Sequence, residues 1–277
     1  MKDVKKNLGS SLIELMVAVT LSLFVLAGVA DLYLASKNNF KRGRDVAKVQ
    51  ENERLIYFIL SQAIQMAGYS GCISGRLQDG IRGFNENNLP AFLQNKKIIK
   101  GSDVLVVKSA NFDIANLLES AKSGDKTIYV KNNPASKNYP WVFLSNCHYK
   151  DQVQANGFFK NKIVLINALK HSYAKDDAEI GGIRETAFFI AKNGRKSGES
   201  LYKLIKSVGI SNKQELLENI KNMYIWYGID LNADHKVDSY LPCNQVENWD
   251  NVLLVKLEID LAMQKKLLMY VKLRERQ

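Results

Sequence analysis

The sequence predicts an α+β protein, in which one long N-terminal helix packs on an antiparallel, β-rich domain. Residues 12–30 are almost wholly apolar, and helical periodicity continues to residue 67 without a proline. Beyond residue 100, short stretches rich in β-branched and aromatic residues alternate with turn sequences such as Gly124-Asp125. One long helix followed by many short strands is typical of this class.

The helix is expected to cover residues 10–67 and to consist of two different halves. Residues 12–30 form the first half, and their length is close to the ~20 apolar residues that a helix needs to cross a bilayer. From Lys37 onwards the helix becomes amphipathic, which predicts that its second half packs on the domain. Gly68 and Gly71 are expected to end it. The apolar positions of the second half are Val46, Val49, Ile56, Ile59, Leu60, Ala63, Ile64 and Ala67.

Residues 68–277 are long enough to form one β-rich domain with its own core. A polar loop is expected between residues 73 and 97, and turns at Asn156-Gly157 and Asn193-Gly194. Residues 212–219 have helical character, because Leu216, Leu217 and Ile220 share one face. Strands are predicted at residues 103–108, 127–131, 141–145, 162–168, 185–191, 201–205 and 252–263.

The N-terminus has an unusual order of residues. A short leader with three lysines precedes Gly9 and Ser10, and the apolar helix follows with Glu14 inside it. A carboxylate within lipid costs at least ~2.5 kcal/mol, so Glu14 requires a partner. A secretory signal would place its small-residue site after the apolar run rather than before it. The order found here resembles the prepilin signal of type IV pilins.

This resemblance implies a processing step and an assembly role. In that family a membrane-bound prepilin peptidase cuts after the glycine and methylates the new N-terminus. Residues 1–9 would then be the leader peptide, Ser10 the first mature residue and Glu14 the fifth. Ser10 stands where the family usually has phenylalanine. Glu14 would pair with the α-amino group of a neighbouring subunit and set the register between subunits.

Two further regions are similar to the PilW family of minor pilins. One is Gln50-Glu51-Asn52 followed by Met66-Ala67-Gly68-Tyr69 and Gly71-Cys72. The other is the C-terminal region, over residues 215–230, 252–263 and 270–276. The resemblance implies the pilin fold and a minor pilin that primes or joins type IV pilus assembly, at or near the tip. It also implies a single-pass inner-membrane protein with a periplasmic domain, which enters the pilus after assembly.

The same resemblance implies the partners. These are the prepilin peptidase, other minor pilins, the major pilin and a tip adhesin, in the context of cell adhesion and twitching motility. A minor pseudopilin of a type II secretion system is one alternative, because it would share the leader and the helix. A DNA-uptake pilin is another, since the formal net charge is +11. The basic residues are spread along the chain, which makes DNA the less favoured partner.

The sequence does not indicate an enzyme. His148, His171 and His235 stand apart, and no nucleophile motif accompanies any of them. Neither a dinucleotide-binding or phosphate-binding glycine motif nor a zinc-protease motif occurs. A binding role is therefore expected.

Three cysteines, Cys72, Cys147 and Cys243, lie far apart and match no metal-binding spacing. An oxidising periplasm favours one disulfide and one spare thiol. All three pairings are compatible with the sequence.

Residues 230–238 carry oxygen-bearing side chains at alternating positions, as hard cations such as Ca²⁺ prefer. His235 stands where an EF-hand has its sharp-turn glycine, and Leu241 where it has its closing glutamate. The alternative is a polar turn whose side chains bond to their own backbone. Calcium is the one cofactor that the sequence suggests. Its ligands would be the side chains of Asp230, Asn232, Asp234 and Asp238 and the carbonyl of Lys236.

Overall fold

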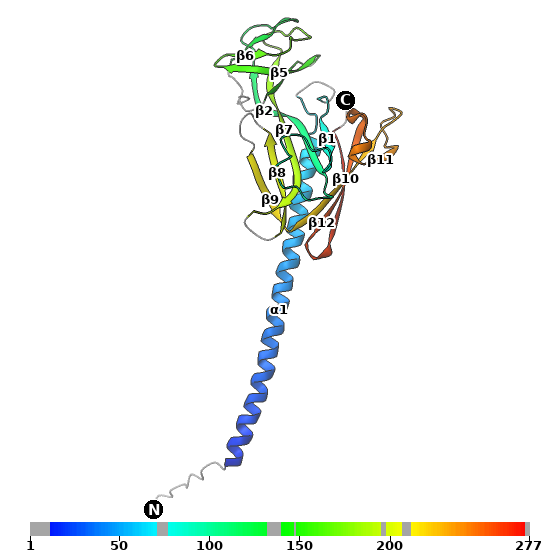
Figure 1. Cartoon of the computed structure of the whole chain (residues 1–277). Helices are drawn as coiled ribbons and strands as arrows, with labels where there is room; N and C mark the ends of the chain where they lie inside the picture. Colours follow the sequence, from blue (N-terminus) through cyan, green and yellow to red (C-terminus); the bar gives the residue numbers. More distant parts are fainter. Residues whose placement is uncertain are drawn as a thin grey trace, which may run out of the picture. The chain divides into compact units, whose positions relative to one another are not determined.

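Figure 1 shows a computed structural model of the chain. It describes residues 12–70, 77–131, 140–146, 148–194, 198–206 and 212–274. The chain divides into two compact units, residues 1–52 and residues 53–277. A long helix runs through the first unit into the second, and the second contains all described strands, which pair antiparallel. This combination of one long helix and antiparallel sheets confirms the predicted α+β class.

Helix α1 covers Leu12–Gln65, and neither Gly28 nor Gly43 interrupts it. Within the second unit, Ile56, Leu60 and Ile64 have no exposed surface, so one stripe of the helix belongs to the domain core. Gly68 then adopts a left-handed φ of 76°, which stops the helix as predicted.

The helix end is tied to the larger sheet. The N–H of Gly68 donates to the carbonyl of Lys108 at 2.8 Å, and the carbonyl of Gly68 accepts from the N–H of Leu77 at 2.7 Å. Backbone passes so closely that a Cβ on Gly80 would lie 2.6 Å from the Cα of Gly68. The turn after the helix therefore requires glycine at both positions.

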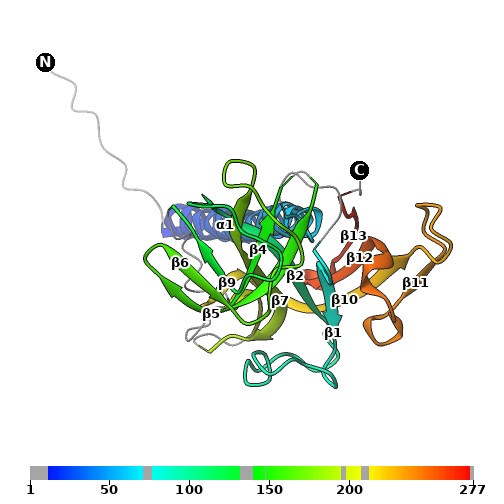
Figure 2. The same ribbon diagram turned by 90° about the horizontal axis from the view of Figure 1, so that it is seen from above.

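The larger sheet follows the order β1-β2-β7-β4-β5-β6-β3, and β8 and then β9 extend it from β7. Strand β7 is its centre, because it pairs with β2, β4 and β8 (Figure 2). Its first residues pair with β4 and its later ones with β8, so the sheet branches along this one strand. The strands are β1 (Ile81–Phe84), β2 (Val104–Asn116), β3 (Thr127–Tyr129), β4 (Trp141–Ser145), β5 (Lys150–Phe159), β6 (Lys162–Leu165), β7 (Glu179–Lys192), β8 (Glu199–Lys206) and β9 (Asn212–Glu218).

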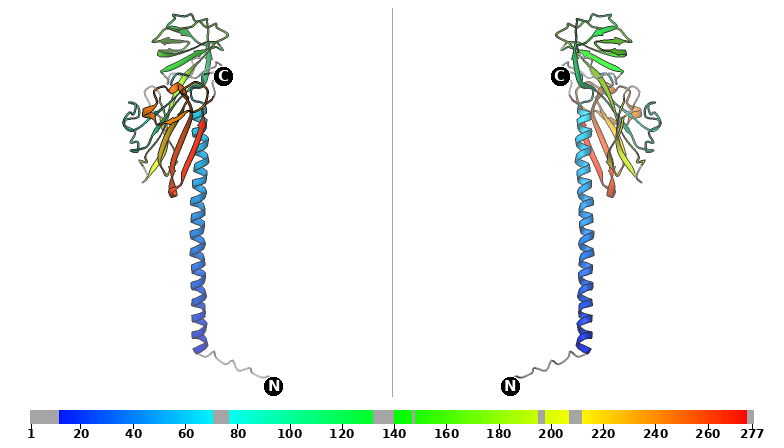
Figure 3. Two further views of the ribbon diagram at one scale, coloured as in Figure 1. Left: turned by 90° about the vertical axis from the view of Figure 1, so that its right-hand side faces the viewer. Right: turned by 90° about the vertical axis from the view of Figure 1, so that its left-hand side faces the viewer.

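The smaller sheet has the order β11-β10-β12-β13. Val255, Leu257 and Ile259 alternate along β12 with no exposed surface, as expected for a strand with one buried face. In Figure 3 these orange and red strands lie beside the end of α1, where Lys265 Nζ is 2.8 Å from Glu53 Oε2. The strands are β10 (Ile220–Ile229), β11 (Ser239–Leu241), β12 (Val252–Leu261) and β13 (Lys266–Lys272).

Ser102 and Asp103 join the two sheets, and the N–H of Met223 on β10 donates to Ser102 Oγ at 3.2 Å. The short β11 pairs with β10 only from Tyr227 onwards, which leaves the earlier part of that β10 edge open. There the N–H of Ile225 donates to Asp103 Oδ2 at 2.8 Å, and the N–H of Asp103 donates to the carbonyl of Met223 at 2.8 Å. Burial raises the pKa of the Asp103 carboxyl, and the bond from Ile225 opposes this shift.

The prediction of a helix at residues 212–219 is wrong. Asn212–Glu218 is strand β9, and it pairs antiparallel with β8. Leu217 is opposite Leu201, and both are buried. Pairing with a neighbouring strand overrides the local helical pattern here.

Other boundaries also differ from the sequence expectation. Within the expected polar loop at residues 73–97, Ile81–Phe84 forms strand β1. Strand β5, Lys150–Phe159, lies where the sequence predicts no strand. Asn156-Gly157 is no turn, because it lies within β5, where the register with β6 shifts between Ala155 and Gly157. The turn lies instead at Lys160-Asn161, between the paired residues Phe159 and Lys162.

Gly83 on β1 offers a test of this packing. A Cβ there would lie 2.2 Å from Tyr227 Oη and 2.8 Å from the Cβ of Cys243, in a buried part of the domain. Gly83→Ala should therefore lower the free energy of unfolding by about 1–3 kcal/mol, the usual cost of overpacking. Gly194→Ala is the control, because nothing lies within 4 Å of its Cβ position. Equal melting temperatures for the two variants would contradict this packing.

Candidate functional site

The N-terminal unit of α1 presents an apolar surface. Its large apolar side chains are exposed, with Leu12 at 75%, Phe24 at 82% and Leu32 at 72%. Among the described residues, α1 is the one helix long and apolar enough to cross a membrane. A surface of this size requires lipid or other apolar helices around it.

Two hydroxyl groups within this surface are satisfied by their own helix. Thr20 Oγ1 donates to the carbonyl of Val17 at 2.9 Å, and Ser22 Oγ donates to the carbonyl of Ala18 at 2.7 Å. Such bonds satisfy hydroxyl groups within an apolar environment without a second helix. Glu14 lies in the first turn of α1, where the helix dipole favours a negative charge. Gly9 and Ser10, the predicted processing site, lie outside the described residues.

The outer face of the smaller sheet carries aromatic side chains, of which Tyr240 and Tyr270 are exposed and Trp226 is half-buried. Trp226, Lys256 and Tyr270 are neighbours across β10, β12 and β13. Lys256 Nζ lies 4.8 Å from the ring centre of Trp226 and 6.0 Å from that of Tyr270. Tyr240 meets the edge of Tyr270 at 6.5 Å between ring centres. Aromatic residues are enriched at protein contact surfaces.

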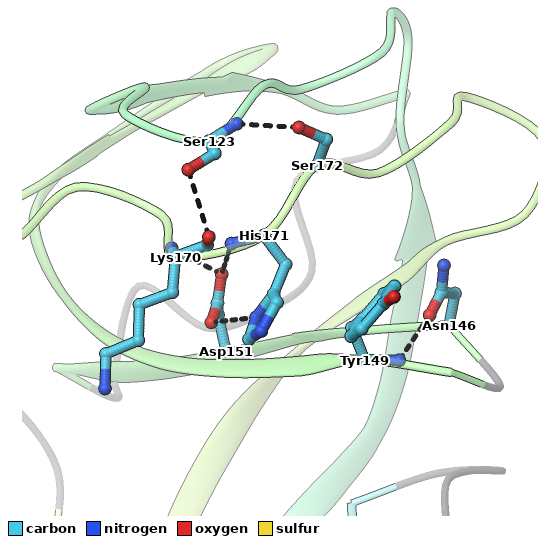
Figure 4. A network of polar contacts seen from close by, with 7 residues as sticks. All are labelled: Ser123, Asn146, Tyr149, Asp151, Lys170, His171 and Ser172. Carbon is cyan, nitrogen blue, oxygen red and sulfur yellow. Dashed lines mark hydrogen bonds and ion pairs between the residues drawn. The ribbon is translucent and has the colours of Figure 1, made fainter.

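A polar network lies around Asp151 on β5 (Figure 4). His171 Nδ1 is 2.9 Å from Asp151 Oδ1, and the N–H groups of Lys170 and His171 donate to Asp151 Oδ2. Tyr149 stacks on the His171 ring at 4.8 Å. Asp151 is buried. Burial of Tyr173, together with the negative charge of Asp151, raises the pKa of the Tyr173 hydroxyl. The sequence gives no local signal for this pair, because Asp151 and His171 are 20 positions apart.

This network resembles part of a catalytic triad, but its hydroxyl groups have a structural role. Ser123 Oγ donates to the carbonyl of Lys170 at 3.0 Å, and the N–H of Ser123 donates to Ser172 Oγ at 3.0 Å. These bonds join two loops. Asp151 likewise holds residues 170–171 against β5. This arrangement agrees with a structural role for the network.

In the Asp230–Asp238 loop, the predicted cation ligands accept hydrogen bonds from the backbone. Asp230 accepts from the N–H groups of Ala233 and His235, and Asp238 accepts from that of Leu231. Asn232 and Asp234 each accept from the N–H group two residues further on. His235 has a left-handed φ of 63° at the position where an EF-hand has glycine.

Within the described part of the chain, no group of three His, Cys, Asp or Glu side chains is arranged to hold a metal ion. A carboxylate oxygen that accepts one hydrogen bond still has a second lone pair. Calcium binding at Asp230, Asn232, Asp234, Lys236 and Asp238 therefore stays a prediction.

Cys243 is a free, buried thiol. Burial, together with the negative charge of Asp103, raises its pKa to about 11. Cys72 and Cys147 lie outside the described residues. Of the three pairings compatible with the sequence, only Cys72 with Cys147 agrees with a free Cys243.

Comparison with known families adds one finding. A family model described as Type IV Pilus-assembly protein W matches residues 187–267. The match begins within β7 and ends at the start of β13, so it includes strands β8 to β12. This match supports a PilW-family type IV pilus protein. No curated protein and no solved structure matches the chain.

The PilW match agrees with the apolar helix of this chain. The family is one of assembly proteins, so interaction with other pilus components is expected. The apolar surface of α1 fits membrane anchoring of a PilW protein. The network around Asp151 lies before the matched residues, and the Asp230–Asp238 loop lies within them.

The state of the cysteines in this protein is directly testable. Protein isolated from the membrane fraction of its cells, denatured without reductant and alkylated, should be labelled once, at Cys243. In the native protein that label should appear slowly, because a raised pKa leaves little thiolate. Peptide mass spectrometry should show Cys72 joined to Cys147. Labelling of all three cysteines would contradict the disulfide.

Calcium binding can be measured as a thermal shift. Millimolar calcium should raise the melting temperature of the protein, since ligand bound to the folded state stabilises it. A loop without a closing glutamate should bind weakly, roughly 10⁻⁴ to 10⁻³ M. Asp234→Ala should abolish the shift, and the exposed Asp176→Ala should leave it intact. An unchanged melting curve would leave the loop as a polar turn.

Proposed function

We propose that this chain is a minor pilin that joins type IV pilus assembly at or near the tip. It is made as a prepilin, cleaved between Gly9 and Ser10, and held in the inner membrane with its β-rich domain in the periplasm. Its work is binding rather than catalysis. The partners are the prepilin peptidase, other minor pilins, the major pilin and a tip adhesin.

The observation that carries this proposal is the change in exposure of the apolar side chains along α1. From Leu12 to Leu34 the large apolar side chains are exposed, whereas Ile56, Leu60 and Ile64 are fully buried. One helix therefore supplies both an apolar surface for lipid or like helices and a stripe for its own domain. A membrane anchor needs only about 20 apolar residues. Because α1 extends over Leu12–Gln65, its length favours a helix that also packs in a filament.

The family match favours a pilus over a secretion system. A minor pseudopilin would need the same leader and helix, and these features do not separate the two classes. The match to the pilus-assembly family at residues 187–267 lies in the C-terminal strands, outside the shared helix. DNA uptake has only the net positive charge in its favour.

Glu14 allows a test of the assembly mechanism. Glu14→Gln should leave cleavage intact but reduce incorporation into sheared pili by about tenfold or more. The reason is that removing one partner of a buried ion pair costs about 3–5 kcal/mol. Asp45→Asn is the control, because it removes an exposed carboxylate from the same helix.

Two readouts separate processing from assembly in this experiment. Mass spectrometry should find Ser10 at the N-terminus of both variants and of the parent. The amount of protein in pili, relative to the membrane, should fall only for Glu14→Gln. Normal incorporation of that variant would contradict the register role, and a mature chain that keeps residues 1–9 would contradict the cleavage.

A further inference from the structure

A pocket of about 350 Å³ lies on the larger sheet, where β1, β2, β7 and β8 run side by side. Lys108, Glu185 and Lys206 are direct neighbours across β2, β7 and β8. The loop that follows β1 supplies the opposite wall. The lining residues are Arg82, Phe84, Pro90, Ala91, Phe92, Val106, Lys108, Glu185 and Lys206.

Positive charge exceeds negative charge in this pocket. Lys206 Nζ lies 2.5 Å from Glu185 Oε2, and Lys108 Nζ lies 3.8 Å from Glu185 Oε1. One partly buried carboxylate therefore faces two ammonium groups. Arg82 adds a third cation, and its nearest carboxylate is Asp79 at 4.0 Å, beyond the lining. With Asp79 included, three cations still face two carboxylates.

The neighbouring surface is also positive. Lys213 Nζ lies 3.8 Å from the ring centre of Tyr202. Tyr202 belongs to the hydrophobic cluster against which Phe84 and Phe92 pack. Burial lowers the pKa of Lys213, the nearby charges of Lys96 and Lys97 lower it further, and the carboxylate of Glu215 opposes this shift. A positive field in a concave site attracts anionic ligands.

Two aromatic rings form the apolar part of the pocket. The Arg82 guanidinium lies 5.8 Å from the ring centre of Phe84, and Lys206 Nζ lies 5.1 Å from that of Phe92. Each cation thus stands beside an apolar surface. Convergent polar groups in an apolar pocket are typical of ligand sites.

We propose that this pocket binds an extended acidic peptide segment of another protein. A carboxylate of the segment would bind Arg82 and Lys206, and an adjacent aromatic side chain would pack on Phe84 and Phe92. The pocket has room for one or two side chains. Nucleic acid would instead need a row of cations on an open surface. No lining residue belongs to α1, so the site is independent of the proposed filament contacts.

The test uses the full chain in a zwitterionic detergent and short labelled peptides. The probe is a capped hexapeptide of alternating Glu and Phe, compared with versions in which Gln replaces Glu or Ala replaces Phe. Fluorescence anisotropy should show saturable binding of the Glu-Phe peptide and clearly weaker binding of the other two. Inorganic phosphate and duplex DNA serve as competitors.

Arg82→Gln should weaken binding of the Glu-Phe peptide about tenfold, because a charge-assisted hydrogen bond is lost. Arg82 is 44% exposed, so this variant should fold normally. Lys162→Gln is the matched control. It removes a cation that lies 6.0 Å from the ring centre of Phe159, outside the pocket. Phe92→Leu should reduce the preference for Phe over Ala peptides.

Three outcomes would overturn the proposal. The first is absence of saturable binding by the Glu-Phe peptide. The second is equal weakening by Arg82→Gln and Lys162→Gln, which would indicate general charge attraction. The third is displacement of the peptide by equimolar DNA or phosphate, which would assign the cations to phosphate groups.

Discussion

The exposed apolar surface of α1 is the constraint on which the rest of this structure depends. Burial of one large apolar side chain is worth about 1.5–3 kcal/mol. Exposure to water of all such side chains between Leu12 and Leu34 would therefore cost more than the ~5–15 kcal/mol that stabilises a typical domain. The helix consequently needs lipid or other apolar helices around residues 12–34, whereas the β-rich unit covers the stripe at Ile56, Leu60 and Ile64.

The architecture of the second unit follows from how its backbone groups are satisfied. Gly68 ends the helix and bonds to β2, so the end of α1 is fixed to the larger sheet. Ser102 and Asp103 then bond to the part of the β10 edge that β11 leaves open, which joins the smaller sheet to the larger one. Strand β7 lets the larger sheet branch.

The polar clusters of the domain differ in how completely their hydrogen-bonding capacity is used. Asp151 accepts two backbone N–H bonds and contacts His171, and the side chains of the Asp230–Asp238 loop likewise accept from backbone groups. These clusters hold loops in place. The pocket around Glu185 is different, because its cations exceed the carboxylates available to them and stand beside aromatic rings. An excess of one charge in a concave site is a property that a ligand can use.

Much of the helical part could be predicted from the sequence alone. The apolar run, the amphipathic second half and the stop at Gly68 depend on residues three or four positions apart, so their signals lie in one short stretch. Several strands, such as Trp141–Ser145, are also predictable, because a short run of aromatic and β-branched residues is a local pattern.

Tertiary structure decided the rest. Asn212–Glu218 has a helical pattern but becomes a strand because β8 pairs with it, and the register shift in β5 depends on β6. The Asp151–His171 contact and the pocket around Glu185 join residues from strands and loops that are far apart in the sequence. The physical reason is that helical contacts are made within one segment. Strand pairing, charge clusters and pockets instead depend on which distant segments the fold brings together.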